Sequence, residues 1–357
     1  MIIPVLLIIL SVCAGHFVFS RKPYISQKEP YSAAVTIIIP ARNEAHNLPH
    51  LLTSLSRQET DYQCLVIDDG STDNTVEVAR QYGARVIPYD HSLAWQGKSA
   101  VCYFGAGYAE ADLLLFLDAD ITLDHEHALR DIISTYNGGL ISIQPYHRTK
   151  QLYEQLSVWF NVLTIVGLNK FAAIQNDDAA AFGPVVLCSK AHYFMTGGHY
   201  GARHHIIEGF GLAHLFKQAE RPVTALLGKE TISFRMYPEG LRAMSKGWAK
   251  HFASGAQATK PWVMGAVVIW MLGSVCSMLF FAWSITQSFS AMLFAGLLYL
   301  FYTVHFHILS RRTGTFTFMT ALLASVAFFY FIYVFTCSWI NTFILKKVEW
   351  KDRNIKL

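Results

Sequence analysis

Two carboxylates, Asp118 and Asp120, directly follow the apolar run LLLFL at residues 113–117. A short run of this kind is typical of a buried parallel strand. Because strand side chains alternate in direction, we expect Asp118 and Asp120 to point to the same side, at the strand end where α/β sheets bind ligands. Two like charges there repel each other unless a cation lies between them. The pair predicts a divalent metal site beside a phosphorylated substrate; the alternative is a solvated loop.

Strand and helix patterns alternate around this pair, which predicts a doubly wound, parallel α/β sheet. The strands are expected at 35–39, 63–67, 85–87 and 113–117, and helices at 47–57, 74 onward and 97–109 separate them. The carboxyl ends of parallel strands meet at one sheet edge, so further polar residues should gather near Asp118. They are Arg42, Glu44, Asp68, Asp69 and Lys98, and Pro40 lies beside them in sequence.

These residue types suit a nucleotide sugar. An aspartate can accept a hydrogen bond from the N3–H of uracil or from a ribose hydroxyl. A divalent ion held by carboxylates and diphosphate oxygens neutralises the departing phosphate. A lysine or a helix N-terminus adds positive potential.

The composition separates a polar middle from apolar ends. Of 357 residues, 53% are hydrophobic and only 15% charged, against roughly 25% charged in a soluble domain. Residues 2–19 are apolar and are followed by Arg21 and Lys22, which predicts an uncleaved anchor with its C-terminal side in the cytoplasm. A cleaved signal peptide is the alternative. The net charge of +4 and the lack of basic blocks predict no nucleic-acid partner.

The C-terminal third predicts membrane helices at 262–283, 291–309 and 317–345. The last segment is long for one span, so a re-entrant hairpin or an interfacial stretch stays open. A basic amphipathic helix precedes them, and we expect Trp248 and Lys250 to lie at the bilayer interface, the alternative being an ordinary surface helix. The expected regions are an anchor (1–22), a catalytic domain (33–236), the interfacial helix (237–260), transmembrane helices (261–345) and a cytosolic tail (346–357).

Four motifs resemble those of glycosyltransferase family 2: IIIPARNE at 37–44, VIDDGSTD at 66–73, WQGK at 95–98 and LDAD at 117–120. The resemblance implies a GT-A fold, a nucleotide-diphospho-sugar donor, Mg²⁺ or Mn²⁺, and inversion at the anomeric carbon. By position it implies that Asp69, with Asp68 beside it, contacts uracil and that Lys98 approaches the diphosphate. Asp120 would be the main metal ligand, and Asp118 would contact metal or ribose. Pro40, Arg42 and Glu44 would line the nucleotide.

Other stretches are similar to bacterial transferases that glycosylate carotenoid acids: 142–147, 182–184, 206–210, 234–237, 247–251 and 348–351. This implies a multi-pass enzyme of the cell membrane with a cytoplasmic catalytic domain. It would transfer glucose from UDP-glucose to the carboxylate of a C30 carotenoid acid in the lipid bilayer. One alternative is another lipid acceptor, such as a polyprenyl phosphate, ceramide or diacylglycerol. The other is a non-catalytic transporter or scaffold.

One position departs from the family pattern. Many members carry Glu-Asp-x-x-Leu, whose Asp deprotonates an acceptor hydroxyl, whereas this chain has Gly209 in the frame Glu208-Gly209-Phe210-Gly211-Leu212. Either Glu208 is the base, or no base is needed because a carboxylic acid is already ionised at neutral pH. A third metal ligand from histidine is also considered, although the spacing favours hydrogen-bonded loop residues: His192, His199, His204 and His205.

Overall fold

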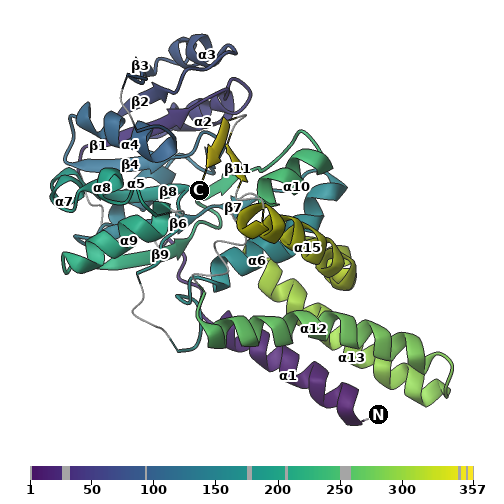
Figure 1. Ribbon diagram of the computed structural model, residues 1–357. Coiled ribbons are helices and arrows are strands. Elements are labelled where there is room, and N and C mark those ends of the chain that lie inside the picture. Colours follow the sequence, from purple (N-terminus) through teal and green to yellow (C-terminus); the bar gives the residue numbers. More distant parts are fainter. Residues whose placement is uncertain are drawn as a thin grey trace. The chain divides into compact units, whose positions relative to one another are not determined.

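The chain forms two compact units, each composed of segments that are distant in sequence. The structure is a computed structural model, and it describes residues 2–25, 33–92, 95–174, 179–205, 208–249, 259–344, 347–350 and 353–356. The first unit comprises Met1–Lys22, His147–Asp177 and Met236–Leu357, and the second comprises Pro23–Tyr146 and Asp178–Arg235 (Figure 1). The second unit is therefore discontinuous, because His147–Asp177, which lies inside the predicted catalytic span, belongs with the apolar helices.

A seven-stranded sheet of order β3-β2-β1-β4-β8-β6-β9 organises the second unit. Strands β3, β2, β1 and β4 are parallel to one another, whereas β8 is antiparallel to both β4 and β6. The α/β class is confirmed, and the four strands predicted to be parallel are parallel; the sheet is mixed because the later strand β8 is antiparallel. The chain reaches β8 after the excursion through the first unit, and an antiparallel neighbour needs no crossover helix. The strands are β1 (Val35–Ala41), β2 (Tyr62–Asp68), β3 (Arg85–Pro88), β4 (Leu113–Leu117), β6 (Leu140–Gln144), β8 (Val185–Ser189) and β9 (Val223–Leu227).

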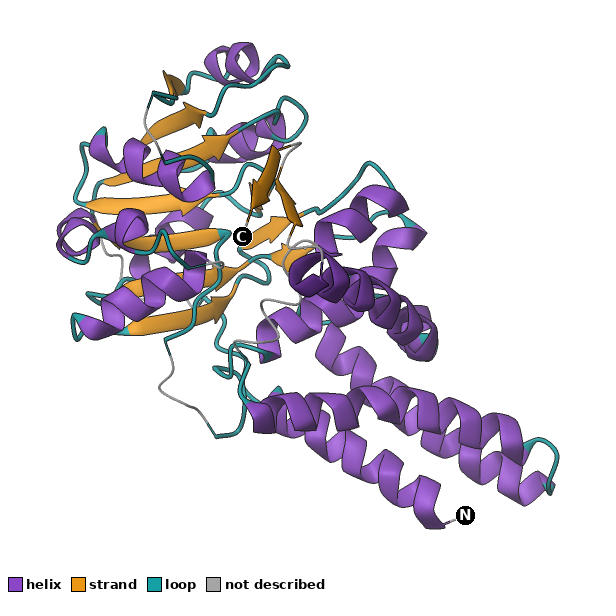
Figure 2. Cartoon of the chain, in the orientation of Figure 1, coloured by secondary structure: helices purple, strands orange, loops and turns teal. Residues whose placement is uncertain are grey.

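Helices flank this sheet, as Figure 2 shows. In α2 (Leu48–Leu55) the leucines recur at helical spacing, and all of them are buried. Short strands β5 (Ile121–Leu123) and β10 (Ile232–Phe234) pair antiparallel, and β7 (Tyr146–His147) lies where the chain passes from one unit to the other. The other helices of this unit are α3 (Thr75–Gln81), α4 (Lys98–Gly107), α5 (Ala128–Ser134), α7 (Lys190–Met195), α8 (Gly198–Gly201) and α9 (Glu208–Gln218).

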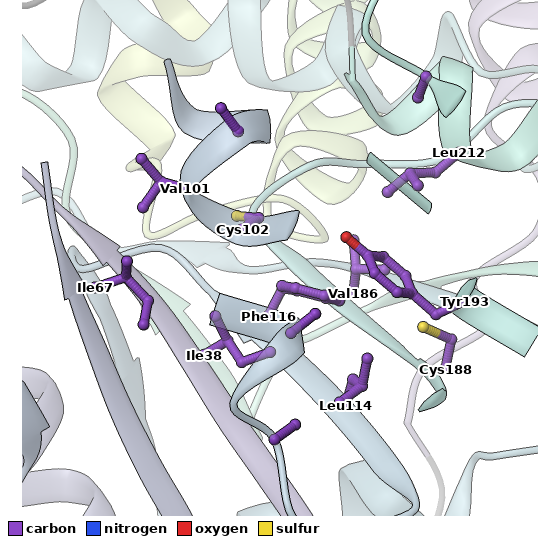
Figure 3. Packing of buried hydrophobic residues seen from close by; sticks show 14 of the residues in the cluster. Ile38, Ile67, Val101, Cys102, Leu114, Phe116, Val186, Cys188, Tyr193 and Leu212 are labelled. Atoms are coloured by element: carbon purple, nitrogen blue, oxygen red, sulfur yellow. The ribbon is translucent and has the colours of Figure 1, made fainter. Parts of the chain in front are cut away.

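The core between the sheet and its helices holds α4 and α9 in place. Val101 and Cys102 of α4 and Leu212 of α9 share one buried cluster with Phe116 and Val186 of the sheet (Figure 3). A Cβ at Gly105 of α4 would lie 2.7 Å from Ile67 and 2.8 Å from Ile38. Only glycine permits this close approach of α4 to the sheet, which sets where α4 begins.

The first unit contains three helices that are long and apolar enough to cross a membrane: Pro261–Ser284 (α12), Phe289–Ser310 (α13) and Ala324–Thr342. The 17-residue apolar helix α1 (Ile2–Val18) packs on α12. A Cβ at Gly15 would lie 2.4 Å from Trp270, and one at Gly273 would lie 2.0 Å from Ser11. Small residues at this contact bring the two helices close together.

The last apolar segment is broken rather than continuous. It forms a short helix, α14 (Phe318–Leu322), then turns at Leu323 into α15 (Ala324–Trp339). Only the second part is long enough to span a bilayer, which explains why the predicted segment looked too long for one span. The remaining elements of the unit are η1 (Leu152–Ser157), α6 (Val158–Val166), α10 (Leu241–Ala249), η2 (Ile340–Ile344), β11 (Lys347–Trp350) and β12 (Arg353–Lys356).

Helix α10 packs against its own unit through Trp248. The Trp248 ring stacks on Phe160 with a centroid distance of 4.9 Å, and its Nε1 donates a hydrogen bond to Ser157 Oγ at 3.2 Å. Met244 of the same helix is fully buried. The contact of Trp248 with a bilayer stays a prediction, and Lys250 lies outside the described residues.

Candidate active site

Every polar residue predicted for the site lies in the second unit, and each one follows a strand or begins a helix. Pro40 is the last residue but one of β1, Asp68 ends β2 and Asp118 follows β4. Lys98 is the first residue of α4, and Glu208 is the first residue of α9. The side chains form two clusters, and each cluster pairs acidic with basic side chains.

The first cluster is centred on Lys98. Its Nζ lies 2.7 Å from Asp118 Oδ1 and 2.5 Å from Glu208 Oε1, and it donates to the Gly183 carbonyl at 3.4 Å. A cation at a helix N-terminus is disfavoured by the helix dipole, while Glu208 at the start of α9 is favoured by it. The two carboxylates therefore hold Lys98 where the helix alone would not.

Burial and charge pairing shift the pKa values in this cluster. Burial opposes the charge of Lys98, but Asp118 and Glu208 outweigh it and raise the pKa of Lys98 well above its ordinary value. Burial also opposes ionisation of Glu208, yet Lys98 and then His199 lower the pKa of that carboxyl. Both Lys98 and Glu208 are thus charged at neutral pH, which leaves Glu208 a poor proton acceptor.

Asp118 and Asp120 form a donor set that suits a divalent cation. Burial, followed by Asp118 and Glu44, raises the pKa of Asp120 to about 7. Burial, and to a smaller degree Glu208, raises the pKa of Asp118 against the opposing effect of Lys98. Neighbouring carboxylates repel each other when both are ionised. A divalent cation would offset this repulsion, because it prefers oxygen ligands and brings positive charge. The residues present therefore fit Mg²⁺ or Mn²⁺.

The second cluster surrounds Asp69, whose side chain is only 1% exposed. Arg42 donates to the Asp69 carbonyl oxygen at 2.6 Å, and its guanidinium lies 4.0 Å from the Asp69 carboxylate. His91 Nε2 lies 3.6 Å from the other carboxylate oxygen. Sequence reasoning missed His91, because it follows β3 with no motif to mark it.

Two other predicted residues shape the loops of this edge. Asp68 accepts hydrogen bonds from the Ser71 N–H at 3.2 and 3.4 Å, which closes the turn after β2. The backbone N–H of Glu44 donates to Thr75 Oγ1 at 2.8 Å, and its carboxylate accepts from Asn47 at 2.7 Å. These bonds tie the loop after β1 to the start of α3, so the strand ends are held together.

Gly209 lies against the backbone of another segment. A Cβ there would lie 2.4 Å from the Ala181 carbonyl oxygen and 3.0 Å from the carbonyl carbons of Ala181 and Phe182. No real Cβ approaches backbone atoms so closely. An aspartate at this position would require the main chain to move, so the place of the usual base is sterically closed.

Around Lys98 lies a hollow whose walls are partly apolar and include His199, which is 2% exposed. His199 Nδ1 is hydrogen-bonded to the Tyr193 hydroxyl at 2.7 Å, and burial lowers the pKa of His199 to about 4. It is thus a neutral, hydrogen-bonded residue. The lining residues are Pro40, Lys98, Cys102, Phe116, Leu117, Asp118, Gly183, Val186, His199, Glu208, Gly209 and Leu212.

Within the described ranges, one group of three side chains has ligand atoms close enough for a metal: Glu59, Glu126 and His127. Both glutamates are exposed, and such acidic groups are common on protein surfaces, so this group gives no reason to expect an ion. None of the four histidines considered from the sequence joins it. The strand-end pair Asp118 and Asp120 remains the better candidate, with further ligands to come from substrate and water.

Comparison with known proteins gives consistent results. Residues 36–160 match the family described as Glycosyl transferase family 2. A 4,4'-diaponeurosporenoate glycosyltransferase from Staphylococcus haemolyticus is 41% identical over 98% of this chain and 96% of its own length. Its counterpart from Staphylococcus aureus (strain USA300) is 39% identical over the same shares. Among solved structures, a mannosyltransferase from Pyrobaculum calidifontis in complex with GDP-Man and Mn²⁺ is 14% identical, with a TM-score of 0.49, and the match covers 90% of this chain and 99% of that one.

Proposed function

The chain belongs to glycosyltransferase family 2, and from this premise we propose that it is a membrane-bound inverting enzyme which transfers glucose from UDP-glucose to a C30 carotenoid acid. The acceptor would be 4,4'-diaponeurosporenoate, the compound for which its relatives are named. The product would be a glucosyl ester. That the chain is a glycosyltransferase with a GT-A-type α/β domain follows from the family; donor, acceptor and stereochemistry are the proposal.

The two charged clusters supply the donor contacts in this proposal. The buried Asp69 carboxylate, fixed by Arg42, accepts the N3–H of uracil, and the loop of Pro40 and Glu44 borders the nucleotide. Lys98 meets the diphosphate, whose charge suits an ammonium. Asp120, together with Asp118, would hold Mg²⁺ or Mn²⁺, and the ion when bound neutralises the charge of the departing diphosphate.

The acceptor reacts as a carboxylate. One of its oxygens attacks the anomeric carbon, a C–O bond forms there, and the bond from that carbon to the diphosphate oxygen breaks with inversion. UDP leaves with the electron pair, and no proton has to move. The observation that carries this part is Gly209, which packs on the Ala181 carbonyl and leaves no room for a side-chain base. A pre-ionised acid is the acceptor class that tolerates its absence.

The apolar helices of the first unit support a place in the cell membrane, where a C30 polyene dissolves. Arg21 and Lys22 directly follow the first apolar helix and favour a cytoplasmic position for the chain after it. UDP-sugars are cytoplasmic metabolites, so this orientation would bring donor and acceptor to the same side. Trp248, on the amphipathic helix α10, would lie at the interface.

The test is transfer of label in membranes that contain the protein. Radiolabelled UDP-glucose, UDP-galactose and GDP-mannose are each incubated with the carotenoid acid, with and without Mg²⁺ or Mn²⁺, and the lipid extract is counted. We expect label to enter the extract from UDP-glucose, and only with a divalent cation. Equal transfer from the other donors, or transfer after chelation, would contradict the donor or the metal part.

A lipid acceptor with a hydroxyl group, such as ceramide or diacylglycerol, is the second candidate, and the closed position at Gly209 counts against it. A polyprenyl phosphate also needs no base and would be detected in the same extracts. A scaffold without catalysis would leave every extract unlabelled.

A further inference from the structure

Both carboxylate oxygens of Glu208 are engaged at the start of α4. Oε1 lies 2.5 Å from Lys98 Nζ, and Oε2 accepts a hydrogen bond from Ser99 Oγ at 3.2 Å. Lys98 and Ser99 are the first two residues of α4, so one side chain from α9 binds the beginning of another helix. The neighbouring ammonium stabilises the ionised carboxylate, which makes Glu208 a weaker base towards an incoming acceptor.

Neighbouring glycines keep Glu208 in this position. The close contact between Gly209 and the Ala181 carbonyl oxygen fixes the backbone next to it. At Gly183 an added Cβ would lie 3.0 Å from Glu208 Oε1, so the glycine leaves the carboxylate its space. The Glu208 side chain is 18% exposed, which makes its charge accessible to the site but not solvated freely.

Lys98 in turn uses all three of its hydrogens on the protein: Asp118, Glu208 and the Gly183 carbonyl are its acceptors. An ammonium has three donors and no more. The contact with Asp118 Oδ1, at 2.7 Å, places the ammonium on one oxygen of a carboxylate that is assigned to the proposed metal. Lys98 is therefore the counter-ion of Asp118.

We propose that Lys98 is an exchangeable counter-ion which a divalent cation displaces from Asp118, and that Glu208, anchored by Ser99, is the positioning residue that retains the displaced ammonium. One cation replaces another on Asp118, the ammonium keeps its proton, and Lys98 stays in the site next to the diphosphate. This inference rests on the proposed function, because it assumes the metal at Asp118 and Asp120. Glu208 acts through Lys98 and is not the base.

The test is a double-mutant cycle on Mn²⁺ affinity, measured by electron paramagnetic resonance of free Mn²⁺ with the full-length protein in nanodiscs and no donor present. In Glu208→Gln, Lys98 loses one charged partner but keeps its ion pair with Asp118 and competes harder, so the Kd for Mn²⁺ should rise about tenfold. In the Lys98→Met background, the same change should alter the Kd by less than about twofold, because the competitor is gone. Ser99→Ala keeps the charges and should raise the Kd about threefold.

If the charge of Glu208 acted directly on the metal and not through Lys98, Glu208→Gln would change the Kd for Mn²⁺ by the same factor or more in the Lys98→Met background. This result would overturn the proposal. So would an unchanged Kd in Glu208→Gln, which together with lost glucose transfer would identify Glu208 as a base. Glu110→Gln is the matched control, since Glu110 forms an exposed ion pair with Arg85 and should leave the Kd unchanged. Circular dichroism and thermal unfolding check that each variant folds.

The two failures remain separable. If the wild-type protein binds Mn²⁺ and transfers glucose but the cycle is additive, only the counter-ion exchange is wrong. If the wild-type protein binds no Mn²⁺, the exchange is overturned together with the metal part of the proposed function. Transfer of label from UDP-glucose then decides whether the rest of that function stands.

Discussion

Two clusters in the second unit pair carboxylates with cations, and they differ in how firmly they are held. Around Asp69, the carboxylate is 1% exposed, nitrogen atoms of His91 and Arg42 lie 3.6 and 4.0 Å away, and Arg42 is also bound to a backbone carbonyl. Around Lys98, the side chains are 18–29% exposed and the ion pairs are direct. A buried acid beside an arginine that is itself bound to a backbone carbonyl suits recognition of a constant part of a ligand. A partly solvated ammonium between two acids suits exchange of charge during a reaction.

The largest loss of transfer rate should come from Asp120→Asn. This variant tests whether the reaction takes place at the cluster around Lys98. Loss of a carboxylate that would bind the metal removes several kcal/mol of charge stabilisation, so we expect transfer to fall about a thousandfold. The initial rate of label transfer from UDP-glucose measures this. Asp112→Asn, at the exposed beginning of β4, is the control and should retain activity. Full activity of Asp120→Asn would remove the basis for a metal site here.

Gly209→Ala tests whether the Lys98 cluster depends on the packing of α9. The added methyl group would meet the Ala181 carbonyl oxygen, and we expect the variant to lose about 1–3 kcal/mol of the free energy of unfolding. Denaturant unfolding measures the loss. In Gly107→Ala the new methyl group meets no atom within 4 Å, so this control should be neutral. Equal stability of the two variants would show that position 209 can carry a side chain.

Asp69→Asn should separate the two clusters. The amide keeps the size of the side chain but loses the charge that Arg42 and His91 face, so the Kd for UDP should rise about tenfold. The Kd for Mn²⁺ alone should not change, because the metal is assigned to the other cluster. Isothermal titration calorimetry gives both constants. If the Kd for UDP and the Kd for Mn²⁺ rose by the same factor, the two clusters would form a single binding site.

Gly183→Ala should have the smallest effect. Its methyl group would meet Glu208 Oε1 at 3.0 Å, and a side-chain end can move by a few tenths of an ångström. We expect the Kd for Mn²⁺ to rise about threefold through the weakened hold on Lys98. Gly107→Ala again serves as control, and an identical Kd for the two variants would speak against a positioning effect of Glu208.

The sequence predicted the strand-end residues well because strand alternation and short motifs are local. Asp118, Lys98 and Asp69 lie at the element ends expected for them. The link between Lys98 and Glu208 could not be derived, since it joins residues 110 positions apart through the packing of α4 and α9. Likewise, no local pattern indicates that Gly209 touches Ala181, or that His91 approaches Asp69.

An apolar run in the sequence predicts a helix, but it does not tell in which unit that helix packs. The apolar stretch 152–168 forms two elements of the first unit, η1 and α6. Trp159 explains the assignment: its Nε1 donates to the Ala324 carbonyl, and its ring packs on Trp270. Periodicity cannot tell an apolar helix of a catalytic domain from one that packs among membrane helices.

We propose above that the enzyme uses an acceptor which arrives already ionised. The most direct test compares initial rates of glucose transfer to 4,4'-diaponeurosporenoate and to the alcohol obtained by reducing its carboxyl group, at equal concentration in the same membranes. We expect rapid transfer to the acid and none measurable to the alcohol. Transfer to the alcohol at the same rate, lost in Glu208→Gln, would contradict it.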